Sequence, residues 1–134
     1  MNDFTTKDMS DMLYDILSEI EDDKANNTEA VLTTPTTKSK FPCRVVCTPL
    51  ESVRQTENAI PILKDFQVSI EHWASKQREC MEMASKTDLE LRKKNFIRTN
   101  TSPILFDEIT KKYRLITTYE VRWNALTNSF QFIR

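Results

Sequence analysis

The 134-residue chain contains no glycine. Average usage would supply roughly nine glycines in a chain of this length, and only glycine enters left-handed backbone conformations without a steric penalty. Phosphate-binding loops and sharp catalytic turns need that freedom. The standard P-loop, dinucleotide-binding fingerprint, EF-hand loop and nucleophile elbow are therefore excluded. A glycine-free, charge-rich composition also favours long helices over folds that are rich in tight turns.

The chain has a single histidine, His72, so a catalytic triad or dyad would have to use its ring as the base. The surrounding stretch, Ile70–Trp73, has a pattern that predicts a helix, with no nucleophile motif nearby. We interpret His72 as a solvated or partly packed helix histidine rather than a catalytic base. Catalysis by carboxylates alone stays open, but no pair can be named. We therefore expect a protein that is not an enzyme and has no small-molecule substrate.

Three cysteines, Cys43, Cys47 and Cys80, make an odd count. The N-terminus is acidic and lacks the apolar stretch of a secretion signal, so we expect reduced thiols in the cytoplasm or nucleus. A zinc site made by these cysteines and His72 is a minor alternative, because the C-x3-C spacing is looser than in common zinc motifs. We expect no cofactor and no metal. No apolar run approaches the ~20 residues that span a bilayer, so we expect no membrane partner.

Charge is unevenly distributed along the chain although the net charge is only −1. Residues 1–23 hold eight acidic side chains and one lysine, whereas residues 92–134 hold nine basic side chains and three acidic ones. The two ends therefore attract each other or attract different partners. Composition and pattern divide the chain into an acidic amphipathic helix (1–23), a flexible Thr/Lys-rich linker (24–47), a long helical, coiled-coil-like segment (48–98) and a basic, aromatic β-hairpin module (99–134).

The first segment has apolar residues at steps of three and four, which places them on one face of a helix. Thr5 or Thr6 can cap this helix at its N-terminus. The helix either packs on the rest of the chain or docks in a groove of a partner, and the sequence leaves both readings open. Its candidate binding face consists of Met9, Met12, Leu13, Ile16, Leu17 and Ile20.

The linker is polar and low in apolar content, which is typical of disorder. Three Ser/Thr-Pro dipeptides, at Thr34, Thr48 and Ser102, have the form that proline-directed kinases read. Such dipeptides are common in loops, so the sequence does not establish regulation by phosphorylation.

The segment 48–98 begins with Thr48-Pro49-Leu50-Glu51, which has the form of a helix N-cap, a proline at the first helical position and a capping box. We expect a helix from here, kinked near Pro61 and continuing to about Arg98. Apolar residues then recur at alternating three- and four-residue steps, as in a heptad seam. A bundle with partner helices is favoured over an intramolecular hairpin. The candidate partner-binding seam is Leu63, Phe66, Ile70, Trp73, Cys80 and Met81.

The last segment alternates apolar and polar residues from Tyr113 to Trp123, which predicts a strand. A turn at residues 124–128 and the resumed alternation at Phe130 predict an antiparallel hairpin. Residues Ile104–Ile109 can add a third strand or a short helical turn. The expected fold class is therefore mainly α with a small C-terminal β-hairpin.

A long coiled-coil helix with a compact end is similar in layout to small subunits of spindle and kinetochore assemblies, such as the outer kinetochore or the augmin complex. That resemblance is architectural only and implies an adaptor in cell division, with acidic tubulin as a fitting partner. The alternative is a nucleic-acid-binding accessory protein that uses the basic C-terminal third. A third reading is a regulator whose acidic N-terminal helix competes with a ligand for that basic end. The candidate electrostatic patch is Arg92, Lys93, Lys94, Arg98, Lys111, Lys112, Arg114 and Arg122.

Overall fold

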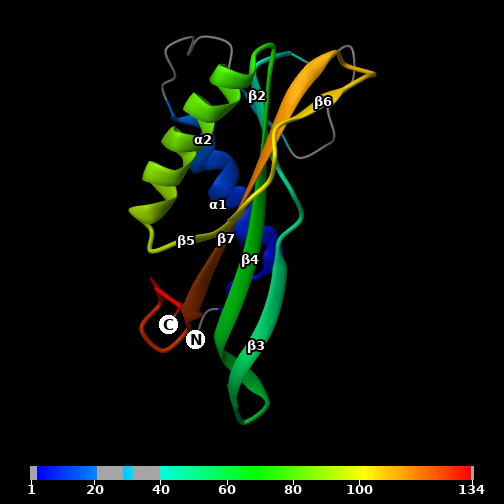
Figure 1. Ribbon diagram of the computed structural model, residues 1–134. Coiled ribbons are helices and arrows are strands. Elements are labelled where there is room, and N and C mark those ends of the chain that lie inside the picture. The colour runs from blue at the N-terminus through cyan, green and yellow to red at the C-terminus, as the bar shows by residue number, and fades with distance from the viewer. Residues whose placement is uncertain (1–2, 21–28, 32–39, 134) are drawn as a thin grey trace.

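Two long antiparallel strands form the centre of the computed structural model, which describes residues 3–20, 29–31 and 40–133. They pair over twelve positions, from Leu63 opposite Asn124 to Ala74 opposite Tyr113. Further strands flank them to give an eight-stranded sheet in which only the β1–β2 pair is parallel (Figure 1). The elements are α1 (Thr6–Ser18), β1 (Glu29–Val31), β2 (Cys43–Val46), β3 (Leu50–Glu57), β4 (Ile60–Ala74), α2 (Gln77–Arg92), β5 (Ile97–Thr101), β6 (Leu105–Asp107), β7 (Lys112–Asn124) and β8 (Ser129–Gln131).

The expected mainly α fold with a long central helix is wrong, because the protein is mainly β. Most of the segment 48–98 forms β3, β4 and the start of β5, and only α2 is helical within it. The pattern in β4 has a period of two, with Phe66, Val68 and Ile70 buried on one face of the sheet. The first four apolar positions of the predicted heptad seam come from both faces of the sheet. Phe66 and Ile70 lie beneath the helices, whereas Leu63 and Trp73 point to the opposite face.

The signal at Thr48-Pro49-Leu50-Glu51 does not start a helix, because β3 begins at Leu50. Pro61 does not kink a helix either. It is the second residue of β4, next to the turn, where its missing N–H interrupts little of the ladder. The last part of the predicted long helix does form a helix, α2, which buries Cys80, Ala84, Thr87 and Leu91 on one face.

Two predicted elements are confirmed. The N-terminal helix is α1, capped by Thr5, whose hydroxyl accepts from the N–H of Asp8 while the Asp8 carboxylate accepts from the N–H of Thr5. The C-terminal hairpin is β7 paired with β8, and β6 shows that, of the two alternatives at Ile104–Ile109, the strand is formed. These strands are part of the same sheet as β4, so they do not form a separate module.

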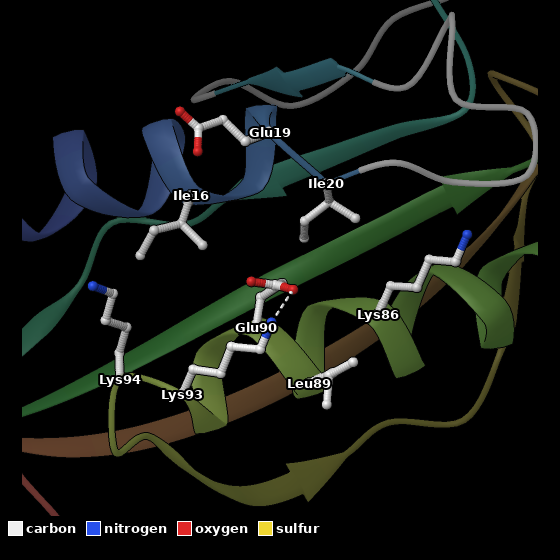
Figure 2. A pocket seen from close by; sticks show the side chains of 8 residues that line it. All are labelled: Ile16, Glu19, Ile20, Lys86, Leu89, Glu90, Lys93 and Lys94. Atoms are coloured by element: carbon white, nitrogen blue, oxygen red, sulfur yellow. Dashed lines mark hydrogen bonds and ion pairs between the residues drawn. The ribbon is translucent and has the colours of Figure 1, made fainter.

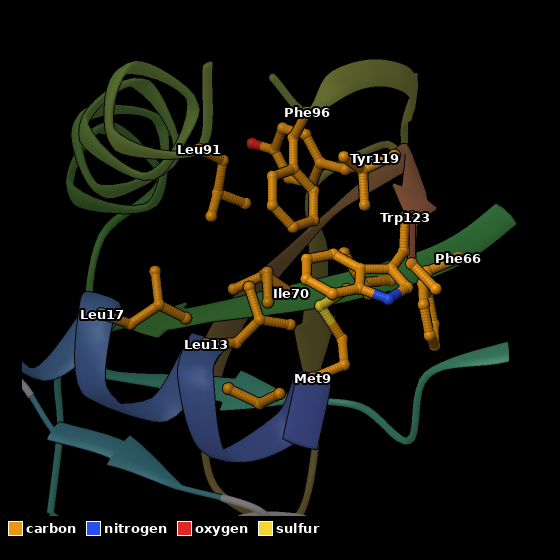
Figure 3. Close-up of a cluster of buried hydrophobic side chains, with 13 residues drawn as sticks. Met9, Leu13, Leu17, Phe66, Ile70, Leu91, Phe96, Tyr119 and Trp123 are labelled. Atoms are coloured by element: carbon orange, nitrogen blue, oxygen red, sulfur yellow. The ribbon is translucent and has the colours of Figure 1, made fainter. Parts of the chain in front are cut away.

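The main core lies between the sheet and the two helices, which cover the same face (Figure 3). Met9, Leu13 and Leu17 of α1 point into it, and Leu91 at the end of α2 closes it. The opposite face of the sheet carries mostly polar side chains, with a smaller apolar cluster of Cys43, Val45 and Trp73 at the β2 end.

Left-handed backbone positions are occupied without glycine. Among the described residues five have positive φ, and three of these are asparagines, the non-glycine residue type that tolerates this conformation best. The other two are Ala59 (φ 65°) and Lys111 (φ 61°), where a Cβ atom makes the conformation costly. Asn58 and Ala59 form the two-residue turn between β3 and β4, and positive φ at both positions is the signature of a type I′ turn. The chain thus makes tight turns that its composition argued against.

Part of the predicted linker at 24–47 lies outside the described residues, including Thr34. The remainder contains β1 and β2, which pair with each other, and β2 also pairs with β4. No helix within the described residues is long and apolar enough to cross a membrane.

Candidate interaction surfaces

A projecting arm, residues 50–61, is a highly exposed part of the sheet. It comprises β3, the Asn58–Ala59 turn and the first two residues of β4, and it extends beyond both helices (Figure 1). All eight residues of β3 are exposed. β3 pairs with β4 along one edge, and within the described part of the chain no strand pairs with its other edge. Three large apolar side chains of the arm are exposed: Leu50 (64%), Val53 (47%) and Ile60 (51%).

Ion pairs on the open face of the sheet join β3 to the two central strands. Asp65 of β4 accepts from Nε of Arg54 on β3 at 2.7 Å and from Nε and a terminal nitrogen of Arg122 on β7 at 2.7 and 3.1 Å. Burial disfavours the charged form of Asp65, but the hydrogen bonds and charges of Arg122 and Arg54 outweigh it and hold the pKa of that carboxyl below its ordinary value. The bidentate contact with Arg122 also fixes the orientation of the carboxylate.

On the helix-covered face, Lys64 ties the arm to the N-terminus. Its ammonium group is nearly buried and lies 2.6 Å from the carboxylate of Asp3 and 3.5 Å from that of Glu51 on β3. It also donates to the carbonyl oxygen of Phe4 at 3.1 Å. Ion pairs therefore attach the root of the arm on both faces of the sheet, so the arm has an ordered conformation and is not a loose loop.

A groove of about 570 Å³ lies between α1 and α2 (Figure 2). Ile16 of α1 and Ile20, which follows the end of that helix, point into it, and Leu89 of α2, which is 51% exposed, lines it as well. Charged side chains line the rest of the groove: Glu19 from α1, and Lys86, Glu90, Lys93 and Lys94 from α2 and the turn that follows it. This apolar groove with charged rims is the second candidate surface.

A buried polar cluster fixes α2 on the sheet. Arg44 of β2 is fully buried and donates to Oγ1 of Thr87 at 2.8 Å and to the carbonyl oxygen of Met83 at 3.0 Å. His72, its partner in the β2–β4 register, donates from Nδ1 to the carbonyl oxygen of Leu115, and its Nε2 lies 2.9 Å from the Thr87 hydroxyl. His72 is therefore a buried strand residue, not the helix residue that was predicted. Both His72 and Thr87 are fully buried, which keeps substrates away from this hydroxyl–imidazole pair.

The three cysteines do not converge. Cys43 and Cys47 belong to the open face of the sheet, whereas Cys80 is buried under α2 on the other face. Burial is the main cause that raises the pKa of the Cys47 and Cys80 thiols to about 11, so both stay protonated near neutral pH. Within the residues that the structure describes, no group of His, Cys, Asp or Glu side chains is placed to hold a metal ion.

The predicted electrostatic patch is dispersed over several elements, and most of its members contact acidic or aromatic neighbours. Arg92 and Arg98 both approach Asp88, at 3.1 and 3.7 Å. Lys112 and Arg114 lie over aromatic rings on the open face, 5.5 and 5.6 Å from the ring centres. The remaining ion pairs are Lys93–Glu90, Lys111–Glu108 and Arg122–Asp65, and Lys94 lines the groove between the helices.

The N-terminal candidates lie in this chain's own core. Met9, Leu13 and Leu17 are buried, and Met12, Ile16 and Ile20 are partly buried against the same cluster. The former seam residues are scattered: Phe66 and Ile70 in the main core, Trp73 in the cluster on the open face, Cys80 under α2, and Leu63 half-buried. Met81 is 56% exposed on α2. No pattern in the sequence predicted the arm, because an exposed edge strand needs no apolar face.

No protein-family model matches the chain, and no curated protein matches it.

Proposed function

We propose that this protein is a non-catalytic subunit of a multi-protein assembly, and that it holds a partner subunit through the arm. The observation that carries the proposal is β3, whose eight residues are all exposed and whose outer edge has no strand partner in the described part of the chain. Exposed edges template the pairing of another chain, and proteins normally blunt them with charged side chains, proline, bulges or a covering element. β3 contains neither lysine nor proline, and its register with β4 is regular from Leu50 to Val53, before the shifts that follow Val53.

The partner element that fits this edge is an extended segment of another subunit that adds to the sheet as a strand. Main-chain hydrogen bonds supply affinity in this mode, and side chains at alternate positions supply specificity. Leu50 and Val53 point to opposite faces of β3, so an added strand can place apolar side chains beside both. A hollow of about 230 Å³ beside β3, lined by Leu50, Gln67 and Glu120 among others, offers room for one side chain.

We propose a multi-protein assembly and assign it to no particular type. The likeness to spindle and kinetochore subunits depended on a long coiled-coil helix, and that helix is absent from the fold. We place the protein inside the cell because Cys47 and Cys80 are free thiols protected by burial, as is usual for reducing compartments.

Nucleic-acid binding by the C-terminal third stays a prediction from the sequence. A binding site of that kind needs basic side chains gathered along one face. Here Arg92, Arg98 and Arg122 are each engaged by a carboxylate, and they lie on different elements. This geometry favours the assembly proposal over the alternative.

Affinity purification from the protein's own cells, with and without nuclease, tests the proposal. The wild-type chain is compared with a Leu50→Lys/Val53→Lys arm variant and with Met81→Lys, a control at a similarly exposed apolar residue on α2. We expect a stoichiometric protein partner with the wild type and the control, and a loss of about tenfold or more with the arm variant, at unchanged circular dichroism. Equal recovery by all three, or recovery that collapses under nuclease, would overturn the proposal.

A further inference from the structure

The helix layer presents an apolar surface that the described residues leave uncovered. Ile16 and Ile20 are only partly buried against the core, and they line the groove together with Leu89. A second hollow, of about 780 Å³, shares Ile16 and Lys94 with the groove and continues along α1 past Met12. The two hollows thus form one continuous surface, which we call the helix surface.

Opposite charges border this surface on its two sides. An acidic rim of Asp11, Asp15 and Glu19 runs along α1 and its C-terminal end, and a basic rim of Lys93 and Lys94 lies just after α2, next to Glu90. Among the residues that the structure describes, no ion pair joins one rim to the other. The rim residues instead form the pairs Lys7–Asp11 and Lys93–Glu90, each between side chains three or four positions apart. Both pairs are largely exposed, so they contribute little to stability and exchange easily.

We propose that the helix surface binds the helix surface of a second copy of this chain, in a two-fold symmetric dimer. A two-fold interface is self-complementary, since each residue that contacts a partner residue is contacted in turn by its equivalent. α1 of each copy then lies on α2 of the other, so that acidic rim meets basic rim twice. The isoleucines and Leu89 of both copies fill the shared centre. Opposite rims across an interface fix its register as well as its partner.

The proposal concerns a different face of the molecule from the arm, so it stands or falls independently of the proposed function. A heterologous partner helix would use the apolar groove but has no reason to carry both rims in the matching order. A second copy of this chain necessarily carries both rims in that order.

Charge exchange between two variants is the decisive experiment, with the full chain analysed by sedimentation and light scattering. One variant is Lys93→Glu/Lys94→Glu, and the other is Asp15→Lys/Glu19→Lys. In either variant alone, both copies of the interface face like charges. In a one-to-one mixture every rim meets its opposite. We expect the wild type to be dimeric, each variant alone to be monomeric, and the mixture to form a dimer with one chain of each kind.

Two further measurements sharpen the result. Leu89→Glu should weaken dimerisation by about tenfold or more, whereas Met81→Glu, at an equally exposed position outside the groove, should leave it unchanged. Raising the salt concentration should weaken the wild-type dimer several-fold, because exposed charges are screened. A wild type that stays monomeric up to ~100 µM, or a mixture that dimerises no better than its components, would overturn the proposal. So would equal effects of the two glutamate substitutions. Circular dichroism confirms that each variant is folded.

Discussion

The arm and the helix-covered core share strand β4 but are stabilised in different ways. In the core, Phe66, Val68 and Ile70 of β4 are buried against the two helices. In the arm, every residue of β3 is exposed, and the main side-chain attachments are the ion pairs of Asp65 and Lys64 at its root. The core therefore supplies the free energy of folding. The arm is a rigid extension of the same sheet, and its exposed side chains are available to a partner.

The largest contrast in unfolding free energy is expected when a leucine is replaced by alanine in each region. Leu13→Ala leaves a cavity in the main core, where the side chain is 0% exposed, and should cost about 2–5 kcal/mol of unfolding free energy. Leu50→Ala in the arm should cost less than about 0.5 kcal/mol. Urea unfolding followed by circular dichroism measures both. Equal losses would mean that the arm is a part of the folding core.

A smaller effect is expected at the root of the arm. Asp65→Asn removes the carboxylate that joins Arg54 to Arg122 and should cost about 1.5–3 kcal/mol at pH 7, because charged hydrogen bonds are lost. Hydrogen exchange of the β3 amides should accelerate at the same time. If β3 exchanges at the wild-type rate, the ion pairs do not hold it.

Lowering the pH should reduce the difference in unfolding free energy between Asp65→Asn and the wild type. The pKa of Asp65 is lowered in the folded state, so its contribution is complete above the ordinary carboxyl pKa of about 3.9 and is lost as the pH falls through the lower folded value. Urea unfolding at pH 7 and at pH 3 measures this. A difference that is constant with pH would exclude the carboxylate charge as the cause.

The smallest effect, and one of opposite sign, is expected at the tip of the arm. Ala59 has φ of 65°, so Ala59→Gly should relieve steric strain and stabilise the protein by about 0.5–1 kcal/mol. The same exchange in the middle of α2, Ala84→Gly, should destabilise by about 1 kcal/mol. Thermal unfolding of the two variants compares the signs directly, and a loss at Ala59 would show that the turn is not strained by its Cβ atom.

Sequence reasoning located the elements whose signals are local. The Thr5 capping box, the helical spacing from Met9 to Leu17 and the alternation from Tyr113 to Trp123 are all contained in short windows. The uneven charge distribution predicted an acidic first helix and a basic patch that includes Lys93 and Lys94, but it did not predict the groove that lies between them.

Sequence reasoning failed in β4 because the alternation there is interrupted by Lys64 and His72. Both point to the buried face, which is possible only because of partners far along the chain: Asp3 for Lys64, and Thr87 and Leu115 for His72. Such partners cannot be read from a window of sequence, so the interrupted strand resembled a helix. β3 gave no strand signal because none of its residues is buried.

Hydrogen exchange with mass spectrometry on the free protein and on the purified assembly tests the central claim, that β3 receives a strand from a partner. The account predicts that the amides of β3 become protected in the assembly by on the order of 100-fold, because their outward groups gain hydrogen bonds, while the exchange of β7 is unchanged. Unchanged exchange in β3, with protection gained elsewhere on the molecule, would contradict it.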